Sequence, residues 1–323
     1  MFDIITFGSA TWDVFLKPKP TQGWQVVKNK KFITGKGICF NLGSKVDVEG
    51  VYFSSGGGGT NVAATFAKQG FKVAYCGRVG DDLSGQEIIK ELKKIGIDCQ
   101  FVFKTKLKST NCSVILNSGL KIDRTILVYR GASELLGKKD IPWSKLRAKW
   151  FYLAPLSGKL CNITEDIVNF AYRNKIKIIF NPGNSQLSLS SEVLKRIIKK
   201  VNILVLNQEE ASLLTKIPYQ KEKEIFKKID EMCPGIVVMT KGFLGVMVSN
   251  GKELYRAKPA KTKVIDRTGA GDSFASGFVS GFIKSKGNIE LSIQLGIANA
   301  NSCLEKCGAK EGLLEKSEKF KKI

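Results

Sequence analysis

Residues 263–283, KVIDRTGAGDSFASGFVSGFI, join a glycine-rich turn to an apolar, helix-like run. Gly269, Ala270 and Gly271 have small or absent side chains, so their backbone N–H groups can converge where the helix begins. The N-terminus of a helix carries partial positive charge and favours anions. Asp272 falls in the first turn, where an acid can act as a simple cap. A cap alone does not require Gly-Ala-Gly before it, so the pattern predicts an anion hole with a carboxylate beside it.

The composition limits the classes of function. The chain has 323 residues, a net charge of +23 and no histidine. Its lysines are spread along the chain and often alternate with glutamate at helical spacing, which predicts solvated helix faces and no specific nucleic-acid partner. Without histidine, a general base near neutral pH must be another side chain, and this makes Asp272 the first candidate.

The sequence carries no signal for a membrane or a disulfide framework. No apolar run approaches the ~20 residues of a membrane span, and the segment MFDIITFGSA lacks a basic leader region, so we expect a cytoplasmic protein. The eight cysteines include no C-x-x-C pair. Free thiols are therefore the expectation, in place of disulfides or a zinc site.

Short β-rich runs alternate with helical patterns along most of the chain. Strands are predicted over residues 3–10, 72–80, 150–156, 177–183, 202–210 and 235–242. Helices are predicted over residues 60–70, 84–96, 164–175 and 190–200. The alternation predicts an α/β fold with a mainly parallel central sheet flanked by helices. Such sheets bind ligands beyond the carboxyl ends of their strands.

Two segments break this alternation. Residues 14–54 and 100–130 have strand-like patterns without long helices, which predicts a small β-sheet that either extends the main sheet or covers a ligand site. We interpret them as β-lid segments, and residues 1–13, 55–99 and 131–323 as the α/β core. Because exposed strand edges favour pairing, we expect a homodimer joined through the lid.

Two more glycine-rich places accompany the first. SSGGGGTNVAATFA, residues 54–67, has four consecutive glycines before a helix, and it either lets the backbone approach a ligand or forms a tight turn. It is not a Walker A loop, because no Gly-Lys-Ser/Thr follows, and its glycines lack the spacing of a dinucleotide fingerprint. TKGFLGVMV, residues 240–248, follows the strand GIVVM and predicts a strand–turn–strand edge near the same end of the sheet.

Four segments, in this order, resemble signatures of the PfkB family of carbohydrate kinases, which have the ribokinase-like fold. They are GGGGTNVAATFAKQG, GRVGDDLSG (77–85), NQEEASLL (207–214) and VIDRTGAGDSFASGF. The resemblance implies phosphoryl transfer from ATP, with Mg²⁺ and in some members K⁺, to a hydroxymethyl group of a sugar. A nucleoside kinase of the same fold is the alternative. From another class, the alternative is a non-catalytic basic binding protein.

The resemblance also implies roles for individual residues. Asp272 matches the base that takes the proton of the acceptor hydroxyl, and Gly269, Ala270 and Gly271 match the anion hole. The positions that match ATP-binding residues are Asn207, Glu210, Thr240, Gly242, Gly245 and Asn299. Glu210 would hold Mg²⁺ through water, and Asp266 matches a ligand of a monovalent cation. The positions that match acceptor-binding residues are Asp13, Gly57, Gly58, Asn61 and Glu134.

The chain departs from ribokinases in ways that leave the acceptor open. Gly58 stands where the ribokinase loop carries lysine, Arg267 replaces a more usual threonine, and residues 14–54 form a longer segment. Three aromatic residues can either stack on a base or sugar ring or pack in the core and lid: Trp12, Phe15 and Trp24.

Overall fold

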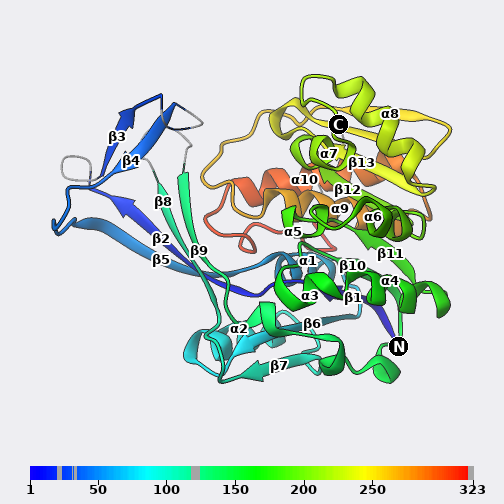
Figure 1. Ribbon diagram of the computed structural model, residues 1–323, viewed down its shortest axis with the longest axis horizontal. Helices are drawn as coiled ribbons and strands as arrows, with labels where there is room; N and C mark the ends of the chain where they lie inside the picture. The colour runs from blue at the N-terminus through cyan, green and yellow to red at the C-terminus, as the bar shows by residue number, and fades with distance from the viewer. Residues whose placement is uncertain (20–23, 31, 33–34, 118–123, 319–323) are drawn as a thin grey trace.

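The computed structural model describes residues 1–19, 24–30, 32, 35–117 and 124–318. Its main feature is a nine-stranded sheet with the order β15-β14-β13-β12-β11-β10-β1-β6-β7 (Figure 1). The strands are β1 (Phe2–Phe7), β6 (Val73–Gly80), β7 (Val102–Thr105), β10 (Ala148–Leu153), β11 (Lys177–Phe180), β12 (Ile203–Asn207), β13 (Ile236–Thr240), β14 (Val246–Ser249) and β15 (Leu254–Ala257). Pairing is parallel from β7 to β13 and antiparallel at β14 and β15. The predicted α/β fold with a mainly parallel sheet is confirmed.

Helices cover both faces of this sheet and enclose two hydrophobic cores, because neighbouring strand residues point to opposite faces. In β10, for example, Phe151 lies in one core and Tyr152 in the other. One face carries α3 (Gly158–Asn162), α4 (Thr164–Arg173), α5 (Asn184–Leu187), α6 (Ser191–Ile198), α7 (Gln208–Thr215) and α8 (Glu222–Met232). The other carries α1 (Gly58–Lys68), α2 (Leu83–Lys94), α9 (Ala270–Lys284) and α10 (Ile289–Leu304). Among the described residues, no helix is long and apolar enough to cross a membrane.

A separate four-stranded sheet projects from the main body, with a β-hairpin at its far end (Figure 1). Its order is β5-β2-β8-β9, and the pairing is parallel only between β2 and β8. The strands are β2 (Thr11–Pro18), β5 (Val48–Gly56), β8 (Asn111–Asn117) and β9 (Arg124–Tyr129), and the hairpin is β3 (Gln25–Lys28) with β4 (Lys36–Cys39).

The small sheet was expected, but the residue ranges predicted for it need correction. The segment 100–130 begins too early, because β7 pairs with β6 in the main sheet. The segment 14–54 is too short at both ends, because β2 begins at Thr11 and β5 ends at Gly56. Residues 20–23, 31, 33–34 and 118–123 of these segments lie outside the described residues.

The helices α9 and α10 pack at close range because glycines line their contact. A Cβ on Gly281 would lie 2.8 Å from Ser292 Cα, and one on Gly277 would lie 3.0 Å from Asn299 Cβ. The small side chains of the SFASGFVSGF run therefore let the two backbones approach. This packing fixes the position of α9, whose first turn carries Asp272.

We predict that Gly281→Ala destabilises the protein, although alanine ordinarily stabilises a helix interior by about 1 kcal/mol. The added methyl group must displace the α10 backbone, and such overpacking costs about 1–3 kcal/mol. Thermal and urea unfolding would measure the change. Gly50→Ala is the control, because a Cβ at that position meets nothing within 4 Å. Equal stability of the two variants would contradict the close-packing interpretation.

Candidate active site

The predicted site residues gather where the parallel strands end. Gly8 follows β1, and its backbone lies against Gly59 in the first turn of α1. Asn207 ends β12 and Thr240 ends β13, and these two residues are partners in the strand register. Parallel sheets bind ligands at this edge. The topology thus brings together segments that are far apart in the sequence.

Asp272 is held by Asn61. Asn61 Nδ2 donates a hydrogen bond of 2.8 Å to Asp272 Oδ2, which connects the starts of α1 and α9. Burial raises the pKa of Asp272, and the hydrogen bond from Asn61 acts in the opposite direction. Asn61 Oδ1 is buried and has no hydrogen-bond partner within the described part of the chain. A ligand hydroxyl beside Asp272 would satisfy it.

The turn before Asp272 is open to an anion. Gly269 has a left-handed φ of 77°, and a Cβ there would lie 2.5 Å from Ala309 Cβ, so only glycine fits. Gly271 is exposed, and a Cβ on it would meet nothing within 4 Å. The first N–H groups of a helix lack intrahelical acceptors. The exposed backbone at Gly271 therefore leaves room for a phosphoryl group to reach them.

Asp266 braces this turn. Its Oδ1 accepts hydrogen bonds from Thr268 N at 3.1 Å and from Thr268 Oγ1 at 2.9 Å, and its Oδ2 accepts one from Gly308 N at 3.0 Å. The carboxylate thus connects the loop after α10 to the anion turn. Within the described ranges, no group of three histidine, cysteine, aspartate or glutamate side chains is placed to hold a metal ion. Binding of a monovalent cation at Asp266 stays a prediction.

The glycine loop lies between Asp13 and Asp272. A Cβ on Gly56 would lie 2.0 Å from Asp13 Oδ2, so the buried Asp13 carboxylate packs directly against the Gly56 backbone. Gly57 has a φ of 96°, which favours glycine. A Cβ on Gly58 would lie 3.7 Å from Asp272 Oδ1. The structure therefore places the predicted acceptor loop directly beside the predicted base.

Asp13 has a shifted proton affinity. Burial raises the pKa of Asp13 to about 6, although a hydrogen bond from Ser113 and the charge of Lys310 act to lower it. Asp266 adds a smaller repulsive contribution. An ionised Asp13 can accept hydrogen bonds from neighbouring hydroxyl groups of a polyol.

The Asn-x-x-Glu segment forms a capping box at the start of α7. Asn207 Oδ1 accepts a hydrogen bond from Glu210 N, and Glu210 Oε2 accepts one from Asn207 N, both at 2.8 Å. Burial, with a smaller contribution from the charge of Asp272, raises the pKa of Glu210 to about 7, although the hydrogen bond from the Asn207 backbone acts to lower it. A desolvated carboxylate beside a second one suits Mg²⁺, which proteins commonly hold with one or two carboxylates together with substrate phosphates.

The loop after β13 turns sharply beside this box. Gly242 and Gly245 have positive φ values of 56° and 101°, and a Cβ on Gly245 would lie 2.0 Å from Ala257 O. Thr240 ends β13 opposite Asn207. Thr240, Gly242 and Gly245 therefore lie in one turn at the carboxyl end of β13, and their contact with a nucleotide stays a prediction.

Asn299 needs correction as a nucleotide contact. Its side chain is fully buried. Its Nδ2 donates to Ser273 O at 2.8 Å and to Thr65 Oγ1 at 3.3 Å, and its Oδ1 accepts from Leu314 N at 2.9 Å. The geometry gives Asn299 a bracing role between α1, α9 and the segment after α10, because no polar atom is left to face a nucleotide.

Glu134 lies beside the acceptor region, but an ion pair engages it. It belongs to the short helix η1 (Ala132–Leu135), and Lys108 Nζ lies 3.4 Å from its Oε2. Ala10 N donates a hydrogen bond of 3.4 Å to the neighbouring Ser133 Oγ, which places η1 next to the start of β2. Contact between Glu134 and a sugar stays a prediction.

The three aromatic candidates pack within the protein. Phe15 is buried beside Tyr52, with ring centroids 5.8 Å apart, and Trp24 is buried against Phe40, 5.9 Å apart. Trp12 stacks on Phe53 at 6.4 Å. Because adjacent residues in a strand point to opposite faces, Trp12 lies on the face of the small sheet away from Asp13.

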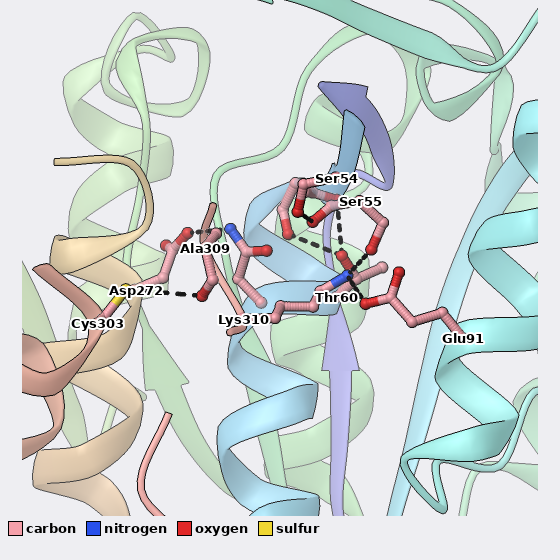
Figure 2. A network of polar contacts seen from close by, with 11 residues as sticks. Ser54, Ser55, Thr60, Glu91, Asp272, Cys303, Ala309 and Lys310 are labelled. Atoms are coloured by element: carbon pink, nitrogen blue, oxygen red, sulfur yellow. Dashed lines mark hydrogen bonds and ion pairs between the residues drawn. The ribbon is translucent and has the colours of Figure 1, made fainter. Parts of the chain in front are cut away.

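Sequence reasoning missed a buried charge at this site. Lys310 is buried, and its ammonium contacts Ser55 and Glu91 (Figure 2). One lysine in a chain with 52 lysine and arginine residues gives no local signal. It also missed the reason for the Gly-Asp-Asp segment, where Asp82 accepts a hydrogen bond from Gly85 N and binds Thr110.

Comparison with known proteins assigns the family. The model of the pfkB family carbohydrate kinases matches residues 35–316. The chain is 30% identical to an uncharacterized sugar kinase of Archaeoglobus fulgidus over 76% of this chain and 97% of that protein. It is 29% identical to a ribokinase of Haemophilus influenzae, over 81% of this chain and 85% of that protein. A cytidine kinase of Thermococcus kodakarensis is 27% identical, over 78% and 88%.

Solved structures agree on the fold. A ribokinase of Arabidopsis thaliana, solved with ribose and ATP, superposes with a TM-score of 0.77 at 19% identity, covering 98% of this chain and 96% of that one. A putative ribokinase II of E. coli, solved with ATP and Mg²⁺, superposes with a TM-score of 0.78 at 16% identity, covering 98% and 97%. Fold and site define a phosphotransferase with an alcohol group as acceptor. The chain belongs to the pfkB family of carbohydrate kinases, as a sugar or nucleoside kinase of the ribokinase-like fold.

Proposed function

We propose that the protein transfers the γ-phosphoryl group of ATP to a hydroxymethyl group of a sugar, with Asp272 as the general base. The observation that carries the proposal is the position of the Asp272 carboxylate, which Asn61 fixes beside an open, glycine-built helix start. A base and an anion hole at adjoining positions are what phosphoryl transfer to an alcohol needs.

The chemistry follows from these two groups. The Asp272 carboxylate accepts the hydroxyl proton as the hydroxyl oxygen bonds to the γ-phosphorus. The bond from that phosphorus to the bridging oxygen breaks, and ADP leaves. The N–H groups at the start of α9 stabilise the charge on the transferred group. The burial that raises the pKa of Asp272 makes it a better proton acceptor than an exposed carboxylate.

Glu210 supports a metal ion in this proposal. Mg²⁺ supplies neutralisation of phosphate charge when it is bound. Glu210 would hold it, because its carboxylate is desolvated, faces the charge of Asp272 and is oriented by Asn207. The similar E. coli structure was solved with ATP and Mg²⁺, which supports Mg²⁺ as the metal ion of this proposal.

The acceptor side favours a neutral polyol. Asp13 and the unpartnered Asn61 Oδ1 are hydrogen-bond acceptors that suit neighbouring hydroxyl groups. Trp12 stacks on Phe53 on the opposite face of the small sheet, so Trp12 offers no stacking surface for a nucleobase beside Asp13. The small sheet, which carries Asp13, would act as the lid that limits water at the site.

We expect Asp272→Asn to fold and bind ATP but to turn over roughly 10²–10⁴-fold more slowly, because asparagine cannot accept the proton. Steady-state kinetics and calorimetric ATP binding would measure the two effects. Glu290→Gln is the matched control, since Glu290 is an exposed acid in the first turn of α10. Near-normal turnover of Asp272→Asn would exclude the proposed base.

The acceptor class is tested by ribose, fructose, adenosine and cytidine, each supplied with ATP and Mg²⁺. We expect ADP release with a sugar and little with the nucleosides. Activity with a nucleoside while both sugars are inert would replace the sugar with a nucleoside acceptor, the activity named for the Thermococcus relative. Binding of nucleic acid without ATP turnover on any acceptor would overturn the enzymatic proposal.

The small sheet also supports a homodimer. On its face away from Asp13, four apolar side chains are about half exposed: Val51, Phe53, Leu127 and Tyr129. Strand register aligns Phe53 with Val14, and Val14 with Val114 in the next strand, so the apolar surface is continuous. A second copy of the chain, presenting the same face, would cover it.

We predict that Phe53→Asp, combined with Leu127→Asp, converts a dimer to a monomer in light scattering. The two carboxylates would be buried and unpaired in the interface, which is costly. Leu254→Asp is the control, because Leu254 is equally exposed but lies on the edge strand β15 of the main sheet. A monomeric wild type at assay concentration would contradict the dimer.

A further inference from the structure

The buried Lys310 is a charged group near the site that the reaction described above does not use. It follows Gly308 and Ala309 in the loop after α10, and only 3% of its surface is exposed. Its Nζ donates a hydrogen bond to Ser55 Oγ, and Glu91 Oε1 of α2 lies 3.6 Å away (Figure 2). A buried ammonium is costly unless charged partners compensate it.

The loop that carries Lys310 runs along the edge of the small sheet where Asp13 lies. Ser55 and Ser54 are consecutive in β5, and Ser54 is the register partner of Asp13 in β2. A Cβ on Gly308 would lie 2.7 Å from Ser54 Oγ, so the loop touches this position of β5. Lys310 therefore reaches the acceptor side from behind the strand that borders it.

The charges around Asp13 and Lys310 make one group. Besides burial, which raises the pKa of Asp13, the positive charge of Lys310 lowers this pKa and the negative charge of Asp266 raises it. Burial and the charge of Asp13 together raise the pKa of the Cys112 thiol. Burial lowers the pKa of Lys310, and the charges of Glu91, Asp13 and Glu311 oppose that change. Lys310 thus supplies the positive charge that favours the ionised form of Asp13. The other charged groups named with them, Glu91, Glu311 and Asp266, are acids.

The same loop also reaches the anion turn. Gly308 N donates to Asp266 Oδ2, and Asp266 Oδ1 binds Thr268, just before Gly269. Gly308 and Lys310 are two residues apart. One short segment thus braces the phosphoryl side through a backbone N–H and the acceptor side through an ammonium.

We propose that Lys310 is a positioning residue of the acceptor site: anchored by Ser55 and Glu91, its ammonium fixes the end of β5, where Ser54 pairs with Asp13, and supplies the positive charge beside which the Asp13 carboxylate binds the acceptor. The inference rests on the proposed role of Asp13 in acceptor binding. It assigns to one buried lysine the tuning of that carboxylate.

Lys310→Met tests the proposal, because it removes the charge and keeps a long side chain. The pH dependence of kcat/KM for the acceptor is the main readout. Titration of the ¹³C-labelled Asp13 carboxyl by NMR, with assignment from Asp13→Asn, is the second. Wild-type Asp13 should titrate near pH 6, and the variant about one pH unit higher. The acid limb of kcat/KM should move in the same direction, with a KM increase that is largest below pH 7.

Two further variants keep the test sharp. Lys284→Met is the matched control, because it removes a lysine of α9 that binds Gln69 Oε1 at 2.6 Å. In this variant, neither the pH dependence of kcat/KM nor the NMR titration of Asp13 should change. Lys310→Met with Glu91→Gln leaves no unpaired charge between these two positions and should show the same upward shift as Lys310→Met. Failure of both Lys310 variants to fold would assign Lys310 to fold stability and overturn the proposal.

The outcomes separate the inference from the function beneath it. An unchanged Asp13 titration in Lys310→Met overturns the role of Lys310, whatever the acceptor is. If Asp13→Asn leaves the KM for the acceptor unchanged, the acceptor role of Asp13 fails, and the positioning role of Lys310 fails with it. A shifted titration together with a raised KM in Asp13→Asn supports both.

Discussion

The hydrogen bond from Asn61 to Asp272 is the contact on which the site depends. It joins two helix starts that are 211 residues apart in the sequence. Each start is built on glycine, because Gly57 and Gly269 have backbone angles that other residues rarely adopt. The packing of α1 against α9, and of α9 against α10, holds these two turns beside each other. Without that packing, the proposed base and the proposed anion hole would not adjoin.

The site concentrates negative charge inside a protein whose net charge is +23. Asp13, Glu210 and Asp272 all have raised pKa values, and burial is the largest cause for each. Carboxylates buried in this way are poorly solvated, so a hydroxyl donor or a cation beside them stabilises their charged form. The positive exterior attracts anionic nucleotides over a longer range. The positive exterior therefore favours anions, whereas the buried carboxylates favour hydroxyl donors and cations.

Local sequence signals predicted the α/β alternation, the glycine turns and the helix that begins beside Asp272. These features depend on spacing and on backbone freedom, which a single chain displays. The position of β7 was not predictable, because four residues of alternating pattern suit either sheet and their pairing with β6 decides. The burial of Asn299 and Lys310 also escaped prediction, since it follows from how α10 and the loop after it pack on α1 and β5. Motifs thus located the candidate site, whereas long-range packing determined which polar side chains brace it.

The central position of β1 has a consequence for the order of assembly. β1 lies between β6 and β10 in the sheet and packs against α1, and the core on this side of the sheet also contains α9 and α10, which come much later in the sequence. During translation, the face of α1 that packs on α9 stays exposed to water or to a chaperone until residues more than two hundred positions later emerge. The Asn61–Asp272 hydrogen bond joins α1 to α9, so the candidate site can form only when α9 packs on α1.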